Sequence, residues 1–271
     1  MPRSIFFVSD GTGITAETLG RALLTQFQGV SLQYVNLPFV NNTDTLALAL
    51  KRIEQAAAAD NEQPIVFSTI IDRGLRERLI DCCAVVIDFF EAFTGRLEGA
   101  LGQQAAHVSG RFHGMGNRTV YGERMNAVHY ALDHDDGVTT RNFSKADVIL
   151  VGVSRSGKTP VSLYLALNYG IHAANYPFSD DDFAIGGLPE RLEPYRAKLF
   201  GLTVQPERLQ QIRQERRPDS RYSDPAQIAN ELKAAEQLYR RERIPFLDVT
   251  FSSVEEIAAA IIQQAGLRRR T

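Results

Sequence analysis

Short apolar runs alternate with amphipathic stretches along most of this chain. Residues 5–8, 32–40 and 64–70 are apolar runs of strand length, and residues 14–27 and 43–59 between them place apolar side chains at helical spacing. Strands that alternate with helices indicate a parallel sheet, because two parallel strands need a crossover connection. The pattern therefore predicts an α/β domain in this part of the chain.

The alternation continues for two more elements and then weakens. Residues 73–84 predict a helix and residues 85–90 a strand, whereas glycines and scattered polar residues from 91 to 120 predict short helices and surface loops. Order returns in residues 121–132, whose apolar side chains share one helical face, and Gly137 is placed to end that helix.

A second alternating set follows. Residues 146–153 have the pattern of a buried strand, and they lead into a Gly-rich loop and an apolar helix in residues 159–170. The remaining expected elements are strands over 171–178, 198–204 and 244–250, and helices over 206–217, over 225–243 and from Ser252 or Ser253, where Glu255 or Glu256 completes a capping box. We therefore predict an α/β protein of two domains. Residues 1–145 form an N-terminal α/β domain, and residues 146–271 a P-loop kinase-like α/β domain with a mostly parallel sheet.

The composition of the chain limits which kinds of molecule it is expected to bind and where in the cell it is expected to work. The chain of 271 residues has 30 Lys and Arg against 32 Asp and Glu, a formal net charge of −2. This balance argues against a nucleic-acid-binding protein, because affinity for a phosphate backbone needs clustered Lys and Arg in excess. No window approaches about 18 consecutive apolar residues, so we expect no contact with a membrane through a spanning helix. Cys82 and Cys83 are adjacent, which suits neither an ordinary disulfide nor a spaced zinc site and fits a cytoplasmic protein.

Residues 152–159, GVSRSGKT, match the phosphate-binding pattern G-x-x-x-x-G-K-[ST] at every specified position, with a strand before and a helix after. In such a loop the backbone N–H groups face the phosphates, Lys158 neutralises their charge and the Thr159 hydroxyl coordinates Mg²⁺. The alternative is a Gly-rich turn without a ligand. The residues expected to bind a nucleotide are Gly152, Val153, Ser154, Arg155, Ser156, Gly157, Lys158 and Thr159.

Phosphoryl transfer also needs carboxylates for the metal ion and for the nucleophile. His134, Asp135 and Asp136 lie at a predicted helix end close in sequence to the loop, where they can supply a general base and a metal ligand, or form a surface turn. Asp248 follows a strand as a Walker-B carboxylate does, or it caps a helix. The loop of residues 9–13, SDGTG, is a further candidate anion site, for which helix capping is the alternative.

Several segments together resemble one protein family. They are SDGTGITAE (9–17), HDDG (134–137), ADVILVGVSRSGKTP (146–160), AANYP (173–177), FGLT (200–203) and DVTFSSVEEIA (248–258). In these segments the chain is similar to the bacterial phosphoenolpyruvate synthase regulatory proteins, which are relatives of the plant regulator of pyruvate, orthophosphate dikinase. The resemblance runs from near the first residue to the last predicted helix.

This resemblance implies a bifunctional regulator. Proteins of the family use ADP to phosphorylate a threonine of the target synthase, which inactivates it, and they reverse the modification with inorganic phosphate, which releases pyrophosphate. For this chain the resemblance implies an ADP-binding loop at residues 152–159 and phosphoenolpyruvate synthase as the protein partner. Our hypothesis for the reaction places Lys158 and Arg155 on the ADP phosphates and Thr159 with an acidic residue on Mg²⁺. In this hypothesis Asp135 or Asp136 is the base that takes the proton of the target threonine.

Two other functions share the loop. An ATP-dependent P-loop kinase of a small metabolite would turn over without any protein partner. A binding module that senses ADP would bind the nucleotide without forming AMP. The sequence does not decide whether the protein forms a homodimer.

Overall fold

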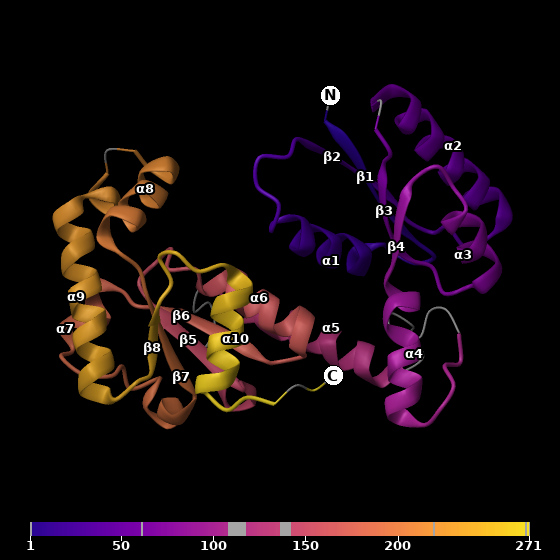
Figure 1. Cartoon of the computed structure of the whole chain (residues 1–271). Helices are drawn as coiled ribbons and strands as arrows, with labels where there is room; N and C mark the ends of the chain where they lie inside the picture. Colours follow the sequence, from indigo (N-terminus) through magenta and orange to yellow (C-terminus); the bar gives the residue numbers. More distant parts are fainter. Residues whose placement is uncertain are drawn as a thin grey trace. The chain divides into compact units, whose positions relative to one another are not determined.

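The structure is a computed structural model that describes residues 2–60, 62–107, 118–135, 142–218, 220–268 and 270. The chain divides into two compact units, Met1–Gly116 and Asn117–Thr271 (Figure 1). Each unit contains a four-stranded sheet, and all neighbouring strands within the described residues pair in parallel. The predicted α/β class and the mostly parallel sheet are therefore confirmed. In the same part of the chain, no helix has the length and apolar character that crossing a membrane requires.

The first unit has the strand order β2-β1-β3-β4. Its strands are β1 (Arg3–Ser9), β2 (Leu32–Leu37), β3 (Ile65–Thr69) and β4 (Val85–Asp88), and its helices are α1 (Ile14–Leu24), α2 (Thr43–Asp60), α3 (Arg73–Ile80) and α4 (Phe89–Leu101). Successive side chains of a strand point to opposite faces of its sheet. Phe6 and Val8 accordingly pack with α2 and α3, whereas Ile5 and Phe7 pack with α1 and the start of α4.

The segment 85–90, which we expected as one strand, is divided by a helix cap. The side chain of Asp88 accepts a hydrogen bond from the backbone N–H of Glu91 at 2.8 Å. Because this bond satisfies one of the free N–H groups at a helix start, Phe89 and Phe90 begin α4 instead of continuing β4. Helix α4 extends to Leu101, so the chain after residue 91 is more regular than expected, and residues 108–117 lie outside the described residues.

The second unit has the strand order β6-β5-β7-β8. Its strands are β5 (Val148–Gly152), β6 (Ala173–Pro177), β7 (Leu199–Thr203) and β8 (Phe246–Asp248), and its helices are α5 (Arg118–Asp133), α6 (Lys158–Tyr169), α7 (Asp180–Ala184), α8 (Pro206–Arg216), α9 (Pro225–Glu242) and α10 (Val254–Gln264), with the 3₁₀ helices η2 (Phe143–Lys145), η3 (Glu193–Lys198) and η4 (Arg221–Ser223). Val148 and Leu150 of β5 pack with α6 and α10, whereas Ile149 and Val151 pack with α9 on the opposite face (Figure 1).

The units divide at 116/117, earlier in the chain than the domain boundary expected at 145/146. Helix α5 packs against α6 through small buried side chains, those of Ala127, Ala131 and Ala166. Because these contacts hold α5 on α6, α5 belongs to the second unit. The end of α5 is thereby brought to the loop that follows β5.

The order of the strands places a change in chain direction at β5 in the second sheet. From β5 the chain passes to β6 on one side and then returns to β7 on the other side of β5. In parallel α/β sheets, ligands bind at the carboxyl ends of the strands where the chain direction switches in this way. The loop of residues 152–157 lies at this switch point, and the loop of residues 9–13 has the equivalent position in the first unit.

Helix α1 packs so closely on the first sheet that only glycine fits at position 20. A Cβ atom on Gly20 would lie 2.6 Å from the ring of Phe7 and 2.8 Å from the ring of Phe67. We predict that Gly20→Ala lowers the free energy of unfolding by about 1–3 kcal/mol, the usual cost of overpacking a core. Urea denaturation measures the change.

The matched control is Gly95→Ala in α4, where a Cβ atom would meet no described atom within 4 Å. Alanine is expected to stabilise this position by about 0.5–1 kcal/mol, because it restricts the unfolded chain and favours the helix. Equal changes in the two variants would contradict the close packing of α1.

Candidate functional site

The loop between β5 and α6 turns through three residues with positive φ. These residues are Gly152, Arg155 and Gly157, with φ of 157°, 74° and 85°. A Cβ atom on Gly152 would lie 2.6 Å from the carbonyl oxygen of Leu202, so the loop passes directly beside β7 and only glycine fits there. Gly157 is the N-cap of α6 and provides no side-chain cap, so the N-terminus of this helix, which attracts anions, lies at the end of the loop.

Lys158 and Ser156 give the loop its polar interior. Lys158 is only 4% exposed, and its Nζ donates a hydrogen bond to the carbonyl oxygen of Val153 at 2.8 Å. The buried Oγ of Ser156 has no hydrogen-bond partner among the described residues. A buried hydroxyl group without a partner is rare in native proteins and calls for an explanation such as a ligand. The loop therefore fits a phosphate group.

Thr159, Asp135 and Asn175 form a hydrogen-bonded group beside the loop. Thr159 Oγ1 donates to Asp135 Oδ1 at 2.7 Å, and Asn175 Nδ2 donates to the same oxygen and, at 3.3 Å, to Thr159 Oγ1. The three residues come from α6, from the end of α5 and from β6. The fold thus brings two expected site residues into contact and adds Asn175, to which we had assigned no role.

This group offers oxygen atoms of the kind that Mg²⁺ prefers. A loop Ser or Thr and one carboxylate hold the ion in P-loop enzymes, where phosphate oxygens supply further ligands. No cluster of three or more His, Cys, Asp or Glu side chains suited to a metal occurs in the described part of the chain. The residues present therefore fit a metal ion that is bound together with a phosphate ligand.

His134 supports this group through its backbone. Its buried ring stacks on the ring of Tyr130 with 4.0 Å between centroids, and its Nδ1 donates to the carbonyl oxygen of Tyr130 at 2.8 Å. The carbonyl oxygen of His134 accepts a hydrogen bond from the backbone N–H of Asn175 at 3.1 Å. The catalytic role that we expected for His134 stays a prediction, and the expected Asp136 lies outside the described residues.

Burial raises the pKa of the Tyr130 hydroxyl to about 12. The hydroxyl is therefore protonated at neutral pH, and it donates a hydrogen bond to the carbonyl oxygen of Asn142 at 3.1 Å. This bond ties α5 to the segment that leads into β5, so it helps to hold the end of α5 in place.

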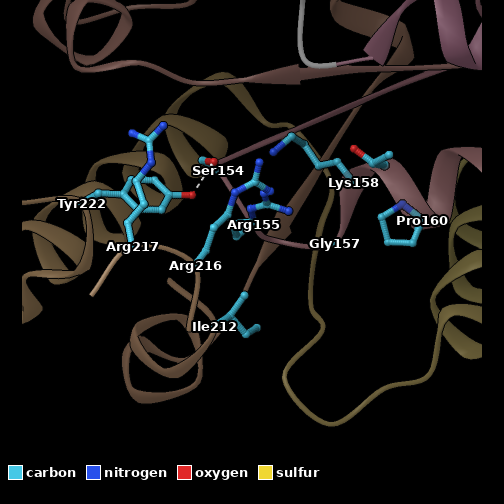
Figure 2. A pocket seen from close by; sticks show the side chains of 10 residues that line it. Ser154, Arg155, Gly157, Lys158, Pro160, Ile212, Arg216, Arg217 and Tyr222 are labelled. Atoms are coloured by element: carbon cyan, nitrogen blue, oxygen red, sulfur yellow. Dashed lines mark hydrogen bonds between the residues drawn. The ribbon is translucent and has the colours of Figure 1, made fainter. Parts of the chain in front are cut away.

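A cavity of about 450 Å³ opens beside the loop (Figure 2). It is lined by Ser154, Arg155, Gly157, Lys158, Thr159 and Pro160 of the loop and α6, and by Ile212, Arg216, Arg217 and Tyr222 of the α8–η4 region. Four of these side chains are cationic at neutral pH and none is acidic. The volume is within the usual range for small-molecule sites, and the charge selects an anion.

Arg213 joins the α8 side of this cavity to the loop. Its side chain is buried, and Nη2 donates to the carbonyl oxygen of Ser154 at 3.1 Å and to Glu231 Oε2 at 2.7 Å. Nη1 donates to the carbonyl oxygen of Tyr222 at 3.1 Å. The Tyr222 ring lies 4.4 Å from the guanidinium carbon, and its hydroxyl is 2.9 Å from Ser154 Oγ (Figure 2). One side chain thus connects α8, α9, η4 and the loop.

Two other expected sites bind the chain's own backbone. Asp248 accepts a hydrogen bond from the N–H of Thr250 at 2.9 Å, and its strand β8 is separated from β5 by β7. Asp10 accepts a hydrogen bond from the N–H of Ile71 at 3.2 Å in the first unit. Asp248 therefore shapes a local turn, whereas Asp10 links the loop after β1 to the segment that follows β3.

The Arg213–Glu231 ion pair gives a prediction about stability. We predict that Arg213→Met lowers the free energy of unfolding by about 3 kcal/mol, because it leaves the largely buried Glu231 carboxylate without its cation. The double variant Arg213→Met/Glu231→Met loses less than the sum of the two single changes, since no unpaired charge stays buried. Urea denaturation of the three variants measures this coupling.

Arg240→Met is the matched control, because the Arg240–Glu236 pair on the same helix as Glu231 is exposed. It is expected to cost less than about 1 kcal/mol. Strictly additive losses in the Arg213 and Glu231 variants would show that the two side chains do not depend on each other.

Comparison with known proteins extends over both units. The family model described as kinase/pyrophosphorylase matches residues 5–262. A protein of Halorhodospira halophila is 51% identical over 99% of this chain and 98% of its own length, and one of Laribacter hongkongensis is 49% identical over the same shares. A protein of Legionella pneumophila is 46% identical over 100% of both chains. All three carry the name "Putative phosphoenolpyruvate synthase regulatory protein".

Proposed function

The chain belongs to the kinase/pyrophosphorylase family, and on this premise we propose that it is a bifunctional regulator of phosphoenolpyruvate synthase. In one direction it transfers the β-phosphoryl group of ADP to a threonine of the synthase, which inactivates the synthase and releases AMP. In the other direction inorganic phosphate takes the phosphoryl group from the phosphothreonine, which gives pyrophosphate and restores the threonine. The names of the relatives support the synthase as the protein substrate.

The observation that carries this proposal is the hydrogen-bonded group of Thr159, Asp135 and Asn175 beside the buried Lys158. Catalysis of phosphoryl transfer consists mainly of positioning and of charge neutralisation. The group of Thr159, Asp135 and Asn175 provides the positioning, because three elements of the fold hold its members in place. Lys158 and Arg155 provide the charge neutralisation.

The loop residues hold the diphosphate where it enters the cavity. A phosphate oxygen takes the place of the Val153 carbonyl oxygen as the partner of Lys158 Nζ, and the loop N–H groups donate to the remaining phosphate oxygens. Arg155 adds a second positive charge in the same cavity. Thr159 and Asp135 would hold Mg²⁺, which neutralises phosphate charge when bound.

We assign the role of proton acceptor to Asp136. Asp135 Oδ1 already accepts hydrogen bonds from Thr159 and Asn175, so we assign this carboxylate to the group that holds Thr159 and the metal ion and not to proton transfer. Asp136 is the next carboxylate in the chain, and it takes the proton of the threonine hydroxyl as the hydroxyl oxygen attacks the β-phosphorus. In the reverse direction the same carboxyl group returns the proton to the threonine oxygen as the bond to phosphorus breaks.

The direct test incubates the protein with phosphoenolpyruvate synthase, Mg²⁺ and β-labelled ADP. We predict label on a threonine of the synthase and an equal amount of AMP, followed by release of labelled pyrophosphate when inorganic phosphate is added. A parallel reaction with γ-labelled ATP, freed of ADP, is predicted to leave the synthase unlabelled.

The other outcomes of this test identify the other functions. Label from ATP alone indicates an ATP-dependent kinase, and nucleotide consumption without the synthase indicates a small-metabolite kinase. ADP binding without AMP formation indicates a sensor of ADP. Each of these results would contradict the proposal.

Three substitutions separate the assigned roles. Lys158→Met is predicted to slow both directions by about 10²–10³-fold, because one preorganised donor to the transferring group is lost. Asp136→Asn is predicted to slow transfer by about 10²–10⁴-fold with unchanged ADP affinity, since it removes only the base. Asp135→Asn is predicted to raise the Mg²⁺ concentration that half-maximal activity requires. Initial rates of synthase labelling and calorimetry with ADP measure these effects.

Asp248→Asn is the control, because it removes a carboxylate at another strand end of the same sheet and is expected to keep the normal rate. If Asp136→Asn kept normal rates while Asp135→Asn lost transfer at saturating Mg²⁺, the assignment of the base would be reversed.

A further inference from the structure

Two arginines at the end of α8 face the cavity together with the loop cations. Arg216, the last residue of α8, lies three residues after Arg213 and so shares its helix face, and Arg217 is the C-cap residue that follows. Because Arg213 is bound to the backbone of Ser154 and Tyr222, this face of α8 is held toward the loop. The side chains of Arg216 and Arg217 accordingly line the same cavity as Arg155 and Lys158 (Figure 2).

The cavity holds more positive charge than one phosphate group requires. Lys158 and Arg155 already serve the loop, and Arg216 and Arg217 add two further guanidinium groups. Within the described residues neither of these two arginines forms an ion pair, whereas Arg213 and Arg221 beside them both do. Unpaired like charges around one cavity repel each other, so a ligand with several negative charges is favoured there.

We propose that Arg216 and Arg217 form a second phosphate subsite, adjacent to the subsite made by the loop. The planar guanidinium group matches the oxygens of a phosphate group with two parallel hydrogen bonds, which suits these residues to a phosphate monoester or a terminal phosphate. The inference rests on the proposed function, in which two phosphate groups meet at the site in each direction. The second phosphate is either the terminal one of a nucleoside diphosphate or a separate phosphate bound beside a nucleoside monophosphate.

Calorimetric titrations with three probes test this subsite without any turnover. The probes are AMP, ADP and inorganic phosphate added in the presence of saturating AMP, all with Mg²⁺. The variant is Arg216→Gln/Arg217→Gln, and the control is Arg208→Gln, which changes an exposed arginine of the same helix outside the cavity.

We expect AMP affinity to change by less than about twofold in the double variant, because AMP fills only the loop subsite. If the second phosphate is that of ADP, ADP affinity falls by about tenfold or more. If it is a separate phosphate, ADP affinity is kept and the binding of inorganic phosphate beside AMP is lost. The Arg208→Gln protein is expected to match the wild type for all three probes.

The inference is overturned if the double variant binds all three probes as the wild type does, or if AMP and ADP lose affinity equally. Wild-type protein that binds none of the probes would instead contradict the proposed function, so the two failures are distinct. Because both arginines are exposed, the double variant is expected to fold, and the single variants Arg216→Gln and Arg217→Gln are measured if it does not.

Discussion

The candidate site depends on the attachment of the loop of residues 152–159 to elements on both of its sides. On one side the buried guanidinium of Arg213 in α8 donates to the carbonyl oxygen of Ser154. The same group also binds Tyr222 of η4 and Glu231 of α9, so it connects the loop to three elements. On the other side Thr159 is bound to Asp135 and Asn175, and with them to α5 and β6. At its start, before these attachments, the loop runs so close to β7 that position 152 accepts only glycine. The backbone of the loop is therefore held in one conformation by the surrounding fold, which is the preorganisation that the proposed phosphoryl transfer needs.

Much of the fold could be predicted from the sequence, because apolar side chains recur at strand and helix spacing and because the loop pattern depends on adjacent residues. The end of β4 could not, since the side chain of Asp88 ends the strand by capping α4. The division at 116/117 was also missed, because only the packing of α5 on α6 assigns α5 to the second unit. In the candidate site, the sequence motif alone identified Lys158 and Thr159 as candidate residues. Arg213 resembles any charged residue of a polar helix, and its burial appears only when α8, α9 and η4 are assembled.

One arrangement of residues serves both directions of the proposed reaction. In each direction a phosphoryl group moves between a threonine oxygen and an oxygen of a second phosphate, so the same cations neutralise the same charge. The loop and α6 supply Arg155 and Lys158, and the C-terminal end of α8, which Arg213 holds at the loop, supplies Arg216 and the following Arg217. The direction then follows from which phosphate compound fills the cavity, ADP as the phosphoryl donor or inorganic phosphate as the phosphoryl acceptor.

The central claim is that the loop holds the phosphates of ADP, and a crystal structure of the protein with ADP and Mg²⁺ tests it most directly. The account predicts the phosphates of ADP in the cavity at residues 152–159, with Lys158 Nζ moved from the carbonyl oxygen of Val153 to a phosphate oxygen and with the metal ion at Thr159. An ADP molecule bound elsewhere, with Lys158 still on Val153, would contradict the account.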